Sequence, residues 1–297
     1  MISIAVAAVA FDQQGGAPPG VWLLPIALAV NVMAADELYL LLAGQRPPLS
    51  QRWQNVGVTT ATFAVASLPI WYPLIAGPYP ADCPVGRAGW LGLSLVAGSL
   101  LWFLHEVYWF NPKESGRAAR IAVRVLLLVY PTLLLATAVL IRQMGEASYG
   151  LSMVVSVIAV SKMSDSGAYF GGRRWGRRPL APALSPKKTV EGAVAGMITG
   201  LVASWVYFAW IAPACFGTRP ITGVASWRSL AYGVAIVLAA MAGDLFESLL
   251  KRDAQIKDSS AWLPGLGGIL DTIDSLLFAF PVAYALTVLD WSGTGGQ

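Results

Sequence analysis

The sequence predicts an all-α fold, a polytopic membrane bundle of about eight transmembrane helices. Of the 297 residues, 56% are hydrophobic and only 12% are charged, whereas a typical soluble domain has roughly 25% charged residues. The apolar residues form long runs that are separated by short polar loops. A soluble chain of this length could not cover its surface with so few charges, so the composition excludes an ordinary soluble protein and a disordered one.

Eight stretches have the roughly 20 mostly apolar residues that a membrane-spanning helix needs. They are residues 21–43, 56–77, 88–107, 119–141, 147–164, 192–213, 229–250 and 269–289. Residues 1–11 are a short candidate for a ninth element, and they lack the basic start of a signal peptide. We divide the chain into N-terminal transmembrane helices, residues 1–150, and C-terminal catalytic helices with two inner polar loops, residues 151–297.

The lysine and arginine residues predict the orientation of these helices. If the N-terminus lies outside, the alternating loops place 16 of the 20 basic residues inside and 4 outside. Cytoplasmic loops carry an excess of Lys and Arg, so the split supports this orientation and the count of eight helices. We expect an integral protein of a bacterial inner membrane. Because the basic residues lie between apolar runs, the net charge of +4 does not point to nucleic acid. Cys83 and Cys215 then face outside, either as a disulfide or as two unpaired thiols.

Carboxylates follow a regular spacing in the second of the two inner polar segments. Asp244 and Glu247 are three residues apart within an apolar run, and Asp271 and Asp274 repeat that spacing. Residues so spaced share one face of a helix, and carboxylates in an apolar helix are costly unless they pair or bind a cation. A turn rich in Gly and Pro, residues 264–268, separates the two pairs.

These pairs predict a divalent-cation site at the cytoplasmic face. Mg²⁺ takes one or two protein carboxylates and completes its shell with water and substrate phosphates, and glycines let backbone amides approach a ligand closely. Lys251, Arg252 and Lys257 are then expected to bind phosphate oxygens, which indicates phosphoryl or nucleotidyl transfer. A solvated helix end with local ion pairs is the alternative for these basic residues. An ion-coupled transporter is less favoured, since the acids gather at one face and no repeat is visible.

The same residues resemble the signature of the phosphatidate cytidylyltransferases, also called CDP-diacylglycerol synthases. That signature has a Ser, a Lys-Arg pair, Lys-Asp, a Pro-x-His-Gly-Gly turn and Asp-Arg-x-Asp. The matching residues here are Ser248, Lys251, Arg252, Lys257, Asp258, Ser260, Leu263, Pro264, Gly267, Gly268, Ile269, Asp271, Ile273 and Asp274. Two upstream segments, residues 164–170 and 185–192, also resemble family segments in the right order, so the resemblance covers residues 160–285.

The chain departs from this signature at two positions. Leu266 stands in place of the signature His, and Thr272 stands in place of the signature Arg. Arg offers a fork of donors that binds phosphate, and Thr does not. A cytidylyltransferase for a different lipid phosphate and an inactive or regulatory paralogue are therefore kept as alternatives. An active enzyme is favoured because the acids and the Lys/Arg cluster are intact.

The resemblance implies transfer of CMP from CTP to phosphatidate, giving CDP-diacylglycerol and pyrophosphate in phospholipid biosynthesis. It implies Mg²⁺ as the cofactor, with a second cation left open, and CTP, a lipid phosphate and membrane lipids as partners, with a homodimer left open. The expected metal ligands are Asp244, Glu247, Asp271 and Asp274. The expected catalytic residues are Lys251, Arg252, Lys257, Asp258, Asp165, Lys188 and Glu191. The expected nucleotide-binding residues are Ser185, Lys188, Gly267 and Gly268.

Other charged residues are assigned roles outside this site. Asp36 and Glu37 are interpreted as an interfacial helix end, with an access path for the substrate as the alternative. Four arginines of the first inner loop are expected to meet anionic lipid headgroups, an attraction of about 1 kcal/mol each near the surface. They are Arg173, Arg174, Arg177 and Arg178.

Overall fold

The computed structural model describes residues 19–43, 47–113, 115–145, 147–218, 226–256 and 268–289. The chain divides into two compact units. The first comprises residues 1–140 with residues 258–270, and the second comprises residues 141–257 with residues 271–297. Neither unit is therefore a single continuous segment of the sequence, and the expected ninth element at residues 1–11 lies outside the described residues.

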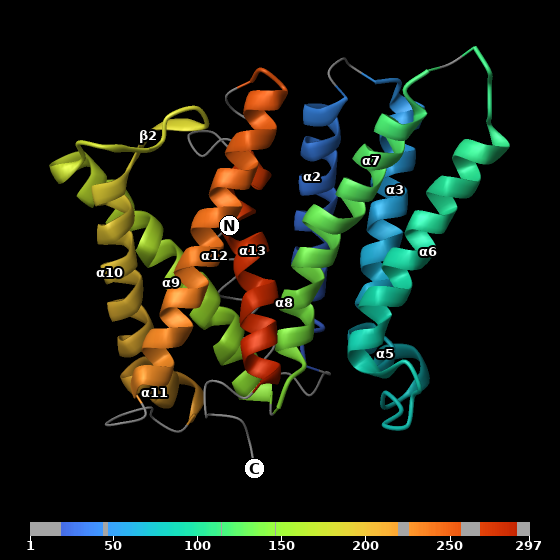
Figure 1. Ribbon diagram of the computed structural model, residues 1–297. Helices are drawn as coiled ribbons and strands as arrows, with labels where there is room; N and C mark the ends of the chain where they lie inside the picture. Colours follow the sequence, from blue (N-terminus) through green and yellow to red (C-terminus); the bar gives the residue numbers. More distant parts are fainter. Residues whose placement is uncertain are drawn as a thin grey trace. The chain divides into compact units, whose positions relative to one another are not determined.

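The predicted polytopic helical membrane fold is confirmed (Figure 1). Within the described residues, six helical segments are long and apolar enough to cross a membrane, and a bent pair adds a seventh when it is counted as one span. These six are Leu24–Leu42, Gly86–Tyr108, Arg117–Arg142, Val190–Phe216, Trp227–Asp253 and Ile269–Val288. The described residues thus hold six or seven candidate spans, beside a prediction of about eight. The remaining predicted stretch, residues 147–164, begins a helix of 29 residues, Ala147–Trp175, which is not among these candidate spans.

The first unit is built from helices that break at prolines. Pro69 lies at the start of one short helix and Pro73 begins the next, and the bent pair that contains them turns by 61°. Pro131 lies in a π-helical turn, where the wider backbone accommodates a residue without an N–H donor. The elements are α2 (Leu24–Leu42), α3 (Leu49–Ala66), α4 (Leu68–Trp71), α5 (Pro73–Ala76), α6 (Gly86–Tyr108), α7 (Arg117–Leu127), η1 (Leu128–Leu133) and α8 (Leu134–Arg142).

A cluster of three arginines around one glutamate ties α6 to α7. The carboxylate of Glu106 lies 2.5 Å from a nitrogen of Arg124, 3.1 Å from Arg117 and 3.2 Å from Arg120. Glu106 and Arg124 are buried, and a buried charge is stable only with such partners. These arginines therefore form ion pairs within the first unit.

Asp36 and Glu37 are buried inside the first unit rather than lying at an exposed helix end. Asp36 accepts two hydrogen bonds from Arg52, of 2.5 and 2.6 Å. The Glu37 carboxylate accepts hydrogen bonds from the backbone N–H groups of Ile269 and Leu270, at 3.0 and 2.9 Å. These two residues begin α13 (Ile269–Val288), so a buried anion stabilises the N-terminus of that helix.

The second unit combines four long helices with one small hairpin. Strands β1 and β2 pair antiparallel, with Pro179 opposite Thr189 and Ala181 opposite Ser185, and Figure 1 shows β2 leading into α10. The sequence did not predict this hairpin, because its prolines hide the strand pattern. The elements are α9 (Ala147–Trp175), β1 (Pro179–Ala181), β2 (Ser185–Thr189), α10 (Val190–Val206), η2 (Tyr207–Ile211), α11 (Ala212–Phe216), α12 (Ser226–Asp253) and α13 from Asp271 onward.

Glycines allow α9 and α10 to pack closely. Gly192, Gly196 and Gly200 recur at every fourth residue of α10, and all three are buried. A side-chain carbon at Gly196 would lie 2.9 Å from the backbone oxygen of Ser164 and 3.0 Å from Cβ of Ala168. Such small residues at a fixed spacing are typical of close helix contacts in membrane proteins. The packing places the polar end of α9 beside the start of α10.

Cys83 and Cys215 are both free thiols. Cys83 belongs to the first unit and Cys215 to the second, so the choice between the disulfide and the two unpaired thiols stays a prediction. Cys215 is exposed and Cys83 is partly exposed.

Candidate functional site

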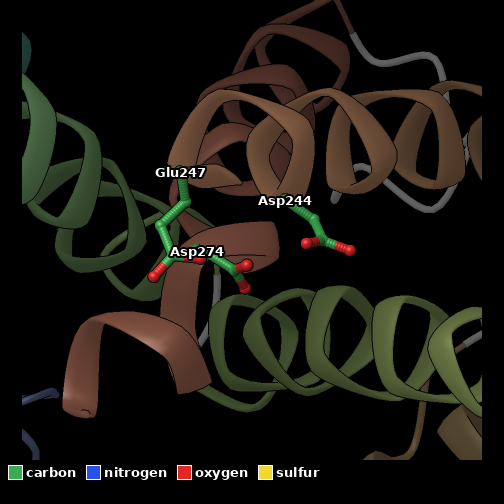
Figure 2. Close-up of side chains that lie close together, drawn as sticks. All are labelled: Asp244, Glu247 and Asp274. Atoms are coloured by element: carbon green, nitrogen blue, oxygen red, sulfur yellow. The ribbon is translucent and has the colours of Figure 1, made fainter. Parts of the chain in front are cut away.

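Three carboxylates of the second unit converge at one place. Asp244 and Glu247 lie on α12, and Asp274 lies on α13. One carboxylate oxygen from each residue lies within 4.8 Å of the other two. Figure 2 shows the three side chains pointing into the same space. Glu247 and Asp274 are buried, whereas the side chain of Asp244 is 35% exposed, so the cluster reaches from the protein interior towards an accessible surface.

A glycine explains how α12 and α13 come so close. A side-chain carbon at Gly243 would overlap the backbone oxygen of Asp274 and would lie 3.2 Å from Cβ of Phe278. Only glycine therefore fits where the two helices touch. Because Asp244 is the next residue on α12, this contact brings the acids of both helices together.

Two lysines neutralise part of the acidic charge. Lys188, from β2, forms an ion pair with Asp244. Lys251, one turn beyond Glu247 on α12, lies 2.7 Å from the Glu247 carboxylate and 2.9 Å from that of Asp271. Of the four acids that the sequence proposed as metal ligands, the described residues therefore bring three together, while Asp271 pairs with Lys251 outside that group.

The three acids suit a hard divalent cation. Oxygen Oε1 of Glu247 is buried and has no hydrogen-bond partner within the described part of the chain. A buried carboxylate oxygen in this state is costly, and a cation would satisfy it. Carboxylate oxygens are also the protein ligands that Mg²⁺ prefers. Asp244, Glu247 and Asp274 therefore have the chemistry and the spacing to hold such an ion together.

A cavity of about 510 Å³ opens beside Asp244 within the second unit. Basic side chains line it, namely those of Arg173, Lys187 and Lys188, and Asp165 faces it from α9. Part of the wall is apolar and includes Leu180, Met241 and Leu245. The cavity therefore offers positive charge for phosphate groups next to the acids, and apolar surface for a less polar group.

Three of the residues that the sequence assigned to catalysis or nucleotide binding line this cavity. Asp165 comes from α9, and Ser185 and Lys188 come from β2. They are separated by at most 23 residues in the sequence, but only the hairpin brings them to one wall. The structure thus groups these three with Asp244, and their catalytic and nucleotide-binding roles stay predictions.

Glu191 and Arg252, which the sequence also assigned to catalysis, brace the hairpin. The Glu191 carboxylate accepts hydrogen bonds from the backbone N–H groups of Arg177 and Arg178, at 3.0 and 3.1 Å. Arg252 donates from Nε to the backbone oxygen of Leu184 at 3.0 Å. In this structure their contacts are with the protein itself, so they hold the cavity wall in place.

The remaining predicted residues lie in the sequence between α12 and α13. Lys257, Asp258 and Gly267 lie outside the described residues, as does Leu266, one of the two departures from the signature. Gly268 is described and directly precedes α13, and Gly268 is buried. The predicted roles of these residues stay predictions.

The sequence analysis missed one residue near the site. Lys162, three residues before Asp165 on α9, donates hydrogen bonds to Asp165 and to two residues of α13. A single lysine in an apolar run was the available signal for Lys162, since such a charge requires partners.

Residues 1–289 match the sequence model of the Cytidylyltransferase family. The chain belongs to this family. The match extends over nearly the whole chain, including the N-terminal helices, where the motifs discussed above are absent. The family that the inner-loop motifs indicated is therefore confirmed.

Several curated members of the family are similar to this chain. The phosphatidate cytidylyltransferase of Haemophilus influenzae is 43% identical over 133 residues, 45% of this chain and 44% of that protein. The enzyme of that name from Bacillus subtilis is 39% identical over 141 residues, 48% of this chain and 49% of that protein. The one from Chlamydia muridarum is 38% identical over 145 residues, 49% of this chain and 46% of that protein. The chain thus spans about half the length of the curated relatives that it matches.

Proposed function

We propose that this cytidylyltransferase-family protein transfers CMP from CTP to phosphatidate, giving CDP-diacylglycerol and pyrophosphate. The observation that carries the proposal is the group of three converging carboxylates, Asp244, Glu247 and Asp274, beside a cavity lined by basic side chains. The names of the similar curated proteins, phosphatidate cytidylyltransferase, support the same reaction and the same two substrates. An integral membrane protein is also suited to a lipid acceptor.

The proposed reaction is a displacement at phosphorus. A phosphate oxygen of phosphatidate forms a bond to the α-phosphorus of CTP, the bond from that phosphorus to the bridging oxygen breaks, and pyrophosphate leaves with the electron pair. Such a displacement depends on alignment and on neutralisation of charge rather than on a covalent intermediate with the protein. Arg173, Lys187 and Lys188 would hold phosphate oxygens in the cavity.

The proposal includes Mg²⁺ held by Asp244, Glu247 and Asp274. Bound there, the ion would supply positive charge to the phosphate oxygens. Lys251 holds Oε2 of Glu247 through its 2.7 Å ion pair, and the buried oxygen Oε1, which has no hydrogen-bond partner among the described residues, would be a ligand for the ion. Lys188 binds Asp244 from the cavity side and links the acidic group to the phosphate-binding wall.

Purified protein incubated with labelled CTP, phosphatidate and Mg²⁺ tests the proposed function. We expect labelled CMP to appear in the lipid fraction together with released pyrophosphate, and EDTA to abolish both. Other lipid phosphates, offered separately, check the acceptor. Transfer only to one of these would contradict phosphatidate as the substrate, and absence of any transfer by folded protein would contradict the enzymatic proposal.

We further propose that the protein lies in a bacterial inner membrane with the acidic site at the cytoplasmic face. The excess of lysine and arginine in the loops assigned to the inside supports this orientation. The bacterial source of the similar proteins named above supports the membrane.

This orientation predicts which thiols react from outside. In intact spheroplasts, a membrane-impermeant maleimide is expected to label the exposed Cys215 and, more slowly, the partly exposed Cys83. A cysteine at exposed Ala183, in the hairpin, is expected to react only after permeabilisation, in a background with Cys83→Ser and Cys215→Ser. Labelling of Ala183→Cys in intact spheroplasts would place the hairpin on the outer side and refute the orientation.

A further inference from the structure

Lys162 is a lysine of α9 that the proposed mechanism does not yet use. Its Nζ lies 3.0 Å from the backbone oxygen of Thr272, 3.2 Å from the hydroxyl of Ser275 and 3.3 Å from the carboxylate of Asp165. A lysine ammonium group has three donors, and here each has an acceptor. Lys162 is therefore a cation in a defined position, although its side chain is 41% exposed.

This cation lies beside the converging acids. Two of its three acceptors, Thr272 and Ser275, flank Asp274 on α13. Lys162 therefore joins the α9 wall of the cavity to the helix that supplies one of the acids.

The acids around the proposed metal site form a charged group with the lysines that lie beside them. The group has five acids and three lysines, so Lys162 offsets one of the negative charges beside the proposed metal site. The acids are Asp165, Asp244, Glu247, Asp271 and Asp274, and the lysines are Lys162, Lys188 and Lys251. Without Lys162, the same region would attract a divalent ion more strongly.

The departure from the family signature falls at the same point. Thr272 stands where the signature has Arg, and the backbone oxygen of Thr272 is the acceptor nearest to Lys162. Thr272 carries no charge, so the positive charge at this turn of α13 comes from Lys162 on α9.

We propose that Lys162 is a built-in cation of the acidic site, which positions Asp165 against α13 and offsets the negative charge of the metal-binding acids. As a like charge, it weakens the binding of a divalent cation to the protein alone. With the triphosphate present, the same charge favours the negatively charged substrate. The effect on catalysis rests on the proposed function, whereas the effect on metal binding does not.

Titration of purified protein with Mn²⁺ alone, without nucleotide, tests this inference by calorimetry. Lys162→Met is expected to bind Mn²⁺ at least about fivefold more tightly than the parent, because a nearby like charge is gone. Lys162→Arg keeps the charge and is expected to stay within about twofold. Arg174→Met is the matched control, since it removes an exposed charge from the same helix outside the cavity lining.

A purely structural role for Lys162 would give the opposite sign. Unchanged or weaker Mn²⁺ binding by a Lys162→Met protein with the parent's melting temperature would overturn the inference, as would an absence of Mn²⁺ binding by the parent. If Lys162→Met does not fold, Lys162→Gln takes its place in the same titration. In the transfer assay, kcat is expected to fall for Lys162→Met and to recover for Lys162→Arg. A parent without transferase activity would refute the proposed function, while the Mn²⁺ comparison would still decide the inference.

Discussion

Replacing Asp244 or Asp274 with Asn is expected to lower CMP transfer by at least about a thousandfold, roughly 4 kcal/mol of transition-state stabilisation. Asn keeps the size of the side chain and one oxygen, but it loses the negative charge that neutralises a divalent cation. Since the cation in turn neutralises the triphosphate, one lost charge weakens the binding of both. The measurement is kcat with labelled CTP and phosphatidate, together with the affinity for Mn²⁺.

Neither replacement should prevent folding or insertion, because removing a charge from an apolar helix favours the membrane. Arg177→Ala is the control, since the contact of Arg177 with Glu191 is made by its backbone N–H and not by its side chain. This variant is expected to keep its activity within about twofold. If kcat of both Asn variants stays within about threefold of the parent, the loss of transition-state stabilisation is under ~1 kcal/mol. That result would show that these acids are not metal ligands.

Replacing Lys251 with Met is expected to destabilise the protein strongly. The Glu247 side chain is 1% exposed and that of Asp271 is 14% exposed, and both would lose their ion pair with the Lys251 ammonium group. Removing one partner of a buried ion pair costs about 3–5 kcal/mol, because the other charge stays buried. The melting temperature of the purified protein in detergent measures the loss.

A double variant separates this effect from a loss of packing. Adding Glu247→Gln to Lys251→Met removes the stranded negative charge, so part of the lost melting temperature should return. A Lys251→Met protein that melts like the parent would show that the ion pair does not contribute to stability. A double variant no more stable than the single one would assign the loss to packing of the lysine chain instead.

Local patterns in the sequence were sufficient to predict the membrane fold and to name the three converging acids, Asp244, Glu247 and Asp274. Long apolar runs predict helices because each run in lipid must satisfy its backbone N–H and C=O groups with hydrogen bonds of its own, whatever its neighbours are. The spacing of Asp244 and Glu247 predicts a shared face for the same local reason, and the structure shows both in one cluster. The count of helices was less certain, because the serines and Lys162 of α9 lie near the limit of what an apolar span tolerates.

Helical spacing alone did not predict the different positions of the two acids in the second pair. Asp271 and Asp274 have the same spacing as the first pair, but Asp274 joins the cluster while Asp271 pairs with Lys251. The helical period could not distinguish them, because the difference depends on which residue of α12 each one meets. Gly243 sets that meeting by allowing the backbone of Asp274 to approach.

The sequence by itself determined the class of fold, the family and the acids of α12, since hydropathy, motifs and helical spacing are properties of short segments. Only the tertiary structure decided that Lys188 reaches Asp244 from the hairpin and that Lys162 reaches α13 from α9, contacts between residues 56 and 110 positions apart. The physical reason is that a charge in an apolar surrounding takes whichever opposite charge the packing brings near. That choice depends on helix contacts, and these are set by small residues such as Gly243 and Gly196 rather than by the charged residues themselves.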